Sequence, residues 1–202
     1  MGGTLYGTTS QGGADGGGTV FTVTTAGAER LLYSFTNAGD GSRPLAGLIN
    51  VGSVVYGTTV TGGAYGYGTV FSVTTAGAER VVYSFKGGSD GANPQAGLIK
   101  VGGMLYSTTC GGGYAGGNGP GTVFAVTTAG AEKVVYSFKD GIDNDGANPE
   151  GGLIDVGGTL YGTTFQAGAY GAGTVFAMTT AGAERVAYTF MDGGDGGYPR
   201  PA

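Results

Sequence analysis

The sequence predicts an all-β protein: a β-propeller of four-stranded antiparallel blades, written as four repeats of about 50 residues with one inner strand missing. The repeat is visible in a Leu/Val-Tyr-Gly/Ser-Thr-Thr motif centred on Tyr6, Tyr56, Tyr106 and Tyr161, spaced by 50, 50 and 55 residues. Runs rich in Val, Thr, Tyr and Phe alternate with the 48 glycines. Such runs are typical of short strands joined by tight turns, and a long internal period is typical of repeat architectures.

Each repeat is predicted to form four strands. In the second repeat they span residues 47–51, 54–59, 68–74 and 80–85. Gly-Ser and Ala-Gly turns join the first and last pairs, which favours antiparallel hairpins. Nothing in the repeat has an apolar period of 3.6 residues, so no helix is expected. The longer third repeat carries its extra residues in two Gly-rich loops, at residues 117–121 and 140–145.

Apolar residues fall on both faces of the predicted strands, as where Leu5 precedes Tyr6 and Val70 precedes Phe71. Both faces of each sheet must then be covered, as they are when blades pack side by side around an axis. A β-helix is disfavoured because its rungs are usually shorter than a 50-residue unit.

We expect residues 1–202 to form a single repeat domain with blades at 1–46, 47–96, 97–151 and 152–202. The first blade lacks its first strand, which leaves 15 strands where four complete blades would need 16. Three arrangements remain open: a four-bladed ring without one strand, a larger ring completed by a second chain, or a segment of a longer propeller. Exposed strand edges promote association, so a homo-oligomer is expected.

Composition excludes several functions. The net charge is −5 and only 11% of residues are charged, so there is no basic stripe to bind nucleic acid. No apolar run is long enough to span a membrane. The chain has no His, which removes the usual general base and the Ser-His-Asp and Cys-His arrangements. We therefore expect no enzymatic activity, and Cys110 is interpreted as a substitution within one repeat rather than as a nucleophile.

The chain resembles the Gloeo-Verruco (GloVer) tandem-repeat family. The resemblance lies in Gly-Gly-Thr-Leu-Tyr-Gly-Thr-Thr at residues 2–9 and Gly-Gly-Gly-Thr-Val-Phe at residues 16–21, and it extends through all four repeats. It implies propeller blades in bacterial proteins that are secreted or anchored at the cell surface, and it carries no catalytic residues. Met1 leads directly into the repeat without a signal peptide, so we expect the chain to be a segment of a longer extracellular parent protein.

The acidic residues are interpreted mainly as turn formers. An Asp-Gly pair precedes a proline in every repeat, at Asp40, Asp90, Asp145 and Asp195, where Asp can bond backbone N–H groups and Gly supplies a positive φ. No cofactor is expected, although Asp140, Asp143 and Asp145 form a cluster similar to an oxygen-ligand Ca²⁺ loop. The repeated Glu-Arg or Glu-Lys pairs that follow Thr-Thr-Ala-Gly-Ala are expected to form a solvated rim.

One face of the predicted propeller collects the variable Gly-rich loops and the Asp-Gly turns. Variable loops on a rigid scaffold often carry binding sites, and exposed tyrosines suit sugars or protein surfaces. The alternative is that the tyrosines only cover loop backbone. The candidate ligand-binding residues on this face are Tyr65, Tyr67, Tyr114, Tyr170, Tyr198, Asp90 and Asn93.

Two functions follow. The first is a non-catalytic binding or scaffold module for a glycan or protein ligand at the cell surface. The second is a structural repeat that self-assembles by strand complementation into a ring or fibre, as the incomplete first blade and the near-identical repeats indicate.

Overall fold

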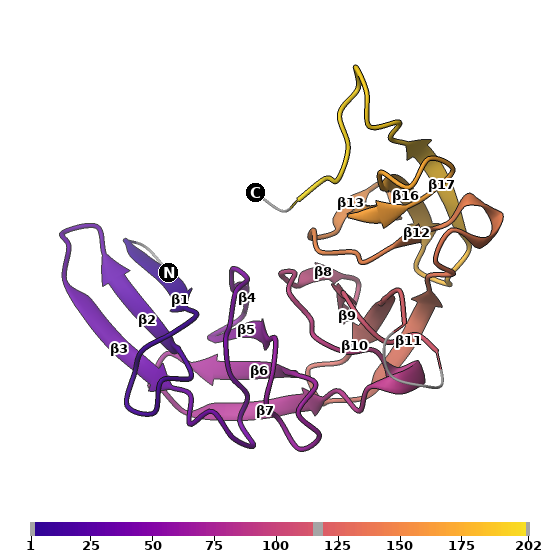
Figure 1. The fold of residues 1–202 in the computed structure, drawn as a ribbon. Helices are drawn as coiled ribbons and strands as arrows, with labels where there is room; N and C mark the ends of the chain where they lie inside the picture. Colours follow the sequence, from indigo (N-terminus) through magenta and orange to yellow (C-terminus); the bar gives the residue numbers. More distant parts are fainter. Residues whose placement is uncertain (1–2, 115–118, 201–202) are drawn as a thin grey trace.

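The computed structural model describes residues 3–114 and 119–200, and each repeat within them forms one antiparallel sheet (Figure 1). The first sheet comprises β1 (Thr4–Thr9), β2 (Thr19–Thr24) and β3 (Glu29–Ser34). The second comprises β4 (Ile49–Val51), β5 (Val54–Thr59), β6 (Thr69–Thr74) and β7 (Glu79–Ser84). The third comprises β8 (Ile99–Val101), β9 (Met104–Thr109), β10 (Thr122–Val126) and β11 (Glu132–Ser137). The fourth comprises β13 (Ile154–Val156), β14 (Thr159–Thr164), β16 (Thr174–Thr179) and β17 (Glu184–Thr189).

The predicted all-β fold of antiparallel sheets is therefore confirmed. Within the described residues the first sheet has three strands and each of the others has four, with strands adjacent in the sheet in the order of the chain. The remaining elements are short and lie in the connections between sheets, except for β15, which lies in the loop between β14 and β16. They are the 3-10 turns η1 (Gly88–Asp90) and η2 (Ile142–Asn144), and the two-residue strands β12 (Gly146–Ala147) and β15 (Gln166–Ala167). Of the loop predicted at residues 117–121, positions 117 and 118 lie outside the described residues.

The Thr-Thr motif joins the two central strands of each sheet. Thr59 ends β5 opposite Thr69 at the start of β6, and their hydroxyl groups lie 2.8 Å apart in the buried interior. The same pair recurs in the third and fourth sheets, again at 2.8 Å. Because a buried hydroxyl needs a hydrogen-bond partner, pairing two threonines satisfies both groups at the end of each central hairpin.

Both faces of the second and third sheets are covered, as the adjacent apolar residues predicted. Val70 and Phe71 are each fully buried, yet Val70 belongs to a cluster shared with the third sheet and Phe71 to a cluster shared with the first. A register shift in the pairing with β7 falls between these two residues. The neighbouring side chains therefore serve two different interfaces.

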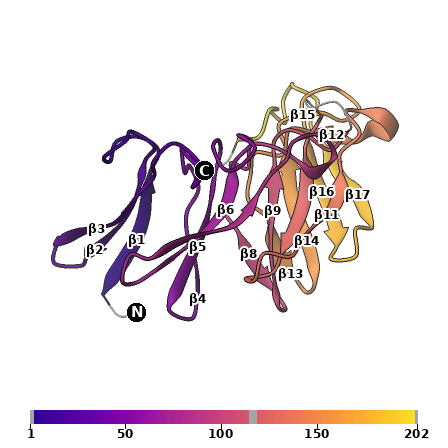
Figure 2. The same ribbon diagram turned by 90° about the horizontal axis from the view of Figure 1, so that it is seen from below.

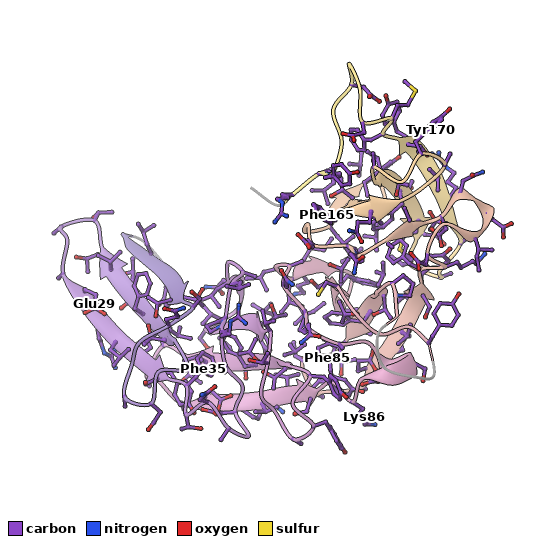
Figure 3. All side chains as sticks on the ribbon, viewed as in Figure 1. Glu29, Phe35, Phe85, Lys86, Phe165 and Tyr170 are labelled. Carbon is purple, nitrogen blue, oxygen red and sulfur yellow. The ribbon has the colours of Figure 1, made fainter. Side chains whose placement is uncertain are left out.

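Aromatic pairs join successive sheets. Phe35 after β3 meets Phe71 of β6 edge to face, with ring centroids 4.9 Å apart. Phe85 meets Phe124 at 4.9 Å and Phe138 meets Phe176 at 5.1 Å in the same geometry. All six rings are fully buried, and Figure 3 shows Phe35 and Phe85 among the packed side chains of the arc. Edge-to-face pairs are favoured by the aromatic quadrupole, so each sheet is fixed to the next by an equivalent contact.

The four sheets follow one another along an open arc (Figure 1). The short strands β4, β8 and β13 lie on its concave side, whereas β3, β7, β11 and β17 lie on its convex side. The first and fourth sheets occupy the two ends of the arc and do not meet. Among the described residues, no helix has the length and apolar character needed to cross a membrane.

Candidate functional site

The loop face consists of the loops between the second and third strands of each repeat together with the connections between sheets. It comprises residues 10–18, 35–48, 60–68, 85–98, 110–114, 119–121, 138–153, 165–173 and 190–200. Backbone hydrogen bonds join a loop to a connection, as from Ser42 N to Thr61 O at 2.8 Å and from Ala92 N to Gly111 O at 2.8 Å. Figure 2 shows β12 and β15 at this end of the molecule, opposite the hairpin turns.

The Asp-Gly turns of this face are held by a tyrosine from the outer strand. The hydroxyl of Tyr83 donates to Asp90 at 2.6 Å, and the same carboxylate accepts the backbone N–H of Lys86 at 2.7 Å. Tyr33 with Asp40 and Tyr136 with Asp145 repeat the contact at 2.8 Å. Of the candidate ligand residues, Asp90 thus has its carboxylate engaged in the turn.

Asn93 is also engaged in the scaffold. Its backbone adopts a left-handed φ of 57°, a conformation that Asn tolerates better than most residues. Its side-chain amide donates to Val60 O at 3.0 Å, and its backbone N–H donates to Tyr67 O at 2.8 Å. Asn148 makes the equivalent side-chain bond to Cys110 O at 2.9 Å. These residues fasten a loop to the connection that crosses it.

The structure does not form the calcium site considered for Asp140, Asp143 and Asp145. The described residues contain no group of three acidic, His or Cys side chains able to hold a metal ion. Asp145 is buried and accepts hydrogen bonds from Tyr136 and from the N–H groups of Lys139 and Gly146. Asp143 is exposed and lies 3.7 Å from the Lys139 ammonium. The interpretation as a metal loop is wrong because Asp145 serves the turn in the sheet rather than the cluster.

The five candidate tyrosines all lie in loop-face segments and are exposed, with exposed fractions from 40% for Tyr67 to 63% for Tyr170. Tyr67 covers loop backbone, since a Cβ at Gly87 would lie 2.7 Å from its ring. Tyr198 packs against Phe165 in a tilted geometry, with ring centroids 5.6 Å apart. Figure 3 places Tyr170 toward the outer edge of the fourth repeat and Phe165 nearer the concave side. The tyrosines are therefore spread over the face rather than gathered in one place.

A cavity of about 360 Å³ opens on the loop face where the third and fourth repeats meet. Its lining combines an exposed carboxylate, two amides and a thiol with glycine backbone, and consists of Cys110, Gly111, Gly119, Pro120, Asp140, Asn148 and Gln166. Cys110 is half-buried and its Sγ lies 3.1 Å from the Gln95 amide nitrogen. Burial raises the pKa of this thiol, which keeps it protonated and weakly nucleophilic near neutral pH.

Sequence reasoning missed part of this site. The residue after Thr-Thr differs in every repeat, being Ser10, Val60, Cys110 and Phe165, and so does the residue after the proline, being Leu45, Gln95, Glu150 and Arg200. The structure brings members of these two sets together: Gln95 contacts Cys110, and the Arg200 guanidinium lies 4.6 Å from the Phe165 ring centroid. Variation at a fixed position between near-identical repeats was the signal that could have found them.

The glutamates expected on a solvated rim lie instead at the interfaces between sheets. Glu79 and Glu132 are half-buried, and one side-chain oxygen of each is buried without a hydrogen bond from the described part of the chain. Burial and then the charge of the preceding repeat's Asp40 raise the pKa of Glu79 to about 7. Burial and then Asp90 raise that of Glu132 to about 7. The rim interpretation was wrong because the neighbouring repeat, about 50 residues away in the chain, covers these side chains.

The fold and this repeated contact pattern define a tandem-repeat protein of packed antiparallel β-sheets. The chain belongs to the Gloeobacter/Verrucomicrobia repeat family, whose model matches residues 1–202, and the family resemblance is thereby confirmed. No curated protein matches the chain. The chain is similar in fold to the crystal structure of a "putative 6-phosphogluconolactonase" from Bacteroides uniformis, with a TM-score of 0.54 and 16% identity. The similarity covers 98% of this chain and 56% of that one, and at this identity it concerns the fold alone.

Proposed function

We propose that this chain is a non-catalytic binding module of the propeller type, whose loop face binds a neutral glycan. The observation that carries the proposal is the location of the differences between repeats. The residues that pack the sheets recur in all four copies, whereas the variable residues after Thr-Thr and after the proline meet on the loop face. A rigid frame that presents variable loops is a common arrangement for binding.

The propeller assignment is part of this proposal. Sheets covered on both faces, short strands on the concave side and consecutive order within each sheet are the features expected of blades. The chain spans 56% of the length of the structurally similar protein, so an arc of four blades would account for just over half of a ring of that size.

The chemistry of the cavity favours a neutral ligand. Its polar lining offers the amides of Asn148 and Gln166 and the carboxylate of Asp140, and none of its lining residues is Lys or Arg. Amides and carboxylates suit sugar hydroxyls, and exposed aromatic rings such as Tyr114 suit the apolar face of a sugar. A phosphorylated sugar would require cationic partners, and the chain has no His for general-base catalysis. The name of the Bacteroides protein is therefore not carried over to this chain.

Calorimetric titration with a panel of neutral oligosaccharides and cell-wall polysaccharides tests the proposal. We expect one class to bind, and Gln166→Ala together with Tyr114→Ala to weaken it at least tenfold. Lys133→Ala, an exposed change on the outer strand β11, is the matched control and should leave binding unchanged. The absence of any binding across the panel would refute the glycan proposal, and unchanged affinity in the double variant would refute this site. The proposed location at the cell surface rests on the family resemblance.

The free edge of the first sheet supports a second candidate, self-assembly by strand complementation. Within the described residues β1 pairs only with β2, whereas the equivalent strands β5, β9 and β14 also pair with a short inner strand. An unpaired edge can accept a strand from another chain. A synthetic peptide with the sequence of residues 47–53 should then bind the edge and dissociate any assembly held by it. An assembly whose mass the peptide leaves unchanged would contradict this candidate.

A further inference from the structure

Each sheet has two different apolar faces. Its leading face contacts the preceding repeat and carries the second-strand aliphatic residue and the third-strand phenylalanine, such as Leu105 and Phe124. Its trailing face contacts the following repeat and carries the second-strand tyrosine and the third-strand valine, such as Tyr106 and Val123. The chain therefore contains three interfaces of one design, in which a trailing face packs on the leading face of the next repeat.

The outermost members of this series are exposed. Leu5 of the first leading face is 62% exposed, whereas its equivalents Val55, Leu105 and Leu160 are at most 2% exposed. At the other end of the arc Ile154 of the last trailing face is 61% exposed, although its equivalents Ile49 and Ile99 pack against the next sheet. Exposed aliphatic residues grouped on a sheet face are typical of an interaction surface.

The last trailing face also contains a cavity of about 180 Å³. It is lined by Gly152, Ile154, Tyr161, Gly162, Thr163 and Val175. In the third repeat the equivalents of the side chains that line it, Tyr106 and Val123, pack in one cluster with Leu160 of the next leading face. Leu5 is the residue equivalent to Leu160, so the first leading face supplies the side chain that this cavity is shaped to receive.

The polar contacts of the end faces are complementary in the same way. Inside the chain a glutamate from the leading face lies beside the Tyr-Asp pair of the preceding repeat, as Glu132 lies beside Tyr83 and Asp90. An arginine of the preceding repeat also donates to the turn of the next, as Arg80 does to Thr128 O at 2.6 Å. At the ends, Glu29 is exposed, and Tyr188 donates to Asp195 beyond the last strand; Figure 3 shows Glu29 at the open end of the arc.

The hairpin turn between β2 and β3 also lacks a contact that the equivalent turns of the later repeats make. A Cβ at Gly77 would lie 2.6 Å from the carbonyl oxygen of Leu32, and one at Gly130 would lie 2.5 Å from that of Val82, so each turn rests on the outer strand of the preceding repeat. A Cβ at Gly27, in the equivalent turn of the first repeat, would meet no described atom within 4 Å.

We propose that two copies of this chain associate head to tail, with the leading face of the first repeat of one copy packed on the trailing face of the fourth repeat of the other. The occupant is identified by the three internal interfaces, since Leu5, Glu29, Tyr161 and the Tyr188–Asp195 pair hold the positions of groups that meet there. The first leading face differs in one respect: it lacks the inner-strand leucine that Leu48, Leu98 and Leu153 contribute to the internal clusters. Two such arcs together exceed the length of the structurally similar chain, so a closed head-to-tail dimer would be a ring larger than that protein, in which both end-face contacts form. This association is separate from the glycan site, because the loop-face cavity proposed for the glycan and the cavity of the trailing end face share no lining residue.

Light scattering on the 202-residue chain and on two single-face variants tests the proposal. Leu5→Glu changes only the leading end face, and Ile154→Glu only the trailing end face. Both positions are more than 60% exposed, so neither change should affect folding. Ile142→Glu, at an equally exposed position in η2, is the matched control.

The expected result is a species of about 40 kDa for the unchanged chain and for Ile142→Glu, twice the chain mass of 19.8 kDa. Each single-face variant should have the mass of a monomer when measured alone. Mixing the two variants should restore a dimer, because each retains the face that the other has lost, whereas a symmetric contact between like faces would not be restored in this way. A monomeric unchanged chain would overturn the proposal, and so would a dimer that persists in either variant alone.

Discussion

Replacing an interface glutamate by glutamine should stabilise the protein at slightly alkaline pH and remove part of its pH dependence. Burial first, and then the Asp90 carboxylate of the preceding repeat, raise the pKa of Glu132 from 4.5 to about 7. The folded state thus favours the protonated glutamate. Its contribution to stability is fully present below pH 4.5 and is lost as the pH rises through about 7. Glutamine is neutral at every pH, so Glu132→Gln avoids this loss.

The magnitude follows from the shift. Since tenfold in an equilibrium constant corresponds to about 1.4 kcal/mol, the change from 4.5 to about 7 sets an upper limit of about 3 kcal/mol for one glutamate. Glu132 is half-buried and Lys86 opposes the shift, so solvent screening reduces the expected effect to about 1–1.5 kcal/mol. Glu79→Gln should act equally, because Glu79 has a pKa of about 7 for the same causes.

The assay is urea unfolding followed by far-ultraviolet circular dichroism at pH 5, 6, 7 and 8, since the chain has no Trp to report by fluorescence. Glu29→Gln is the matched control, measured in the Leu5→Glu background, in which the proposed head-to-tail contact is absent: Glu29 holds the same position in the first repeat but is exposed in the single chain. The pKa of Asp195 is lowered, mainly by the hydrogen bond from Tyr188, so its titration changes the stability only at a more acidic pH. Wild-type stability that is constant from pH 5 to 8, or an equal gain in Glu29→Gln, would refute the reasoning.

Three further predictions concern packing and reactivity. Both packing predictions apply in the Leu5→Glu background, in which the proposed head-to-tail contact is absent. Phe124→Ala should lower the free energy of unfolding by about 3–4 kcal/mol, because it leaves a cavity opposite the fully buried Phe85, whereas Phe190→Ala at the half-buried end should cost clearly less in the same urea titration. Gly77→Ala should destabilise the protein by at least about 1 kcal/mol more than Gly27→Ala, since both glycines have positive φ but only Gly77 lies against the preceding strand; equal losses would contradict this packing. Cys110 should react with a thiol reagent at pH 7 more slowly than a free cysteine, because burial raises its pKa, and a rate equal to that of the free amino acid would show that the thiol is accessible.

The sheets could be predicted from the sequence because the same pattern of strand and turn residues occurs in all four repeats. The Thr-Thr pairs, the Asp-Gly turns and the Val-Phe neighbours recur at a fixed spacing, and each depends on contacts within a repeat or on the simple requirement that both sheet faces be covered. The three-stranded first sheet followed from the same count. These are local consequences of strand geometry.

The interface glutamates could not be predicted in this way. Their sequence neighbours are a turn and a charged residue, which indicate exposure. In the structure Glu79 lies beside Tyr33 and Asp40, and Glu132 beside Tyr83 and Asp90, all of them residues of the preceding repeat. The proposed calcium loop failed for a related reason: the spacing of Asp140, Asp143 and Asp145 says nothing about Tyr136, which takes the last of them for the turn. Charge placement in a repeat protein depends on the neighbouring unit.

The repetition also separates the frame of this protein from its variable surface. The same contact between neighbouring sheets occurs at three interfaces. The position that makes it is therefore a phenylalanine in each case, and Phe71, Phe124 and Phe176 are buried to the same extent. The residues after Thr-Thr have no such constraint, and in the third and fourth repeats Cys110 and Phe165 contact different partners, Gln95 and Arg200. Differences at these positions change the loop face without disturbing the interfaces. The same frame specifies the chemistry of the exposed ends, because Leu5 and Ile154 keep the residue types that their buried equivalents require. The proposed binding on the loops and the proposed association through the end faces therefore depend on different residues.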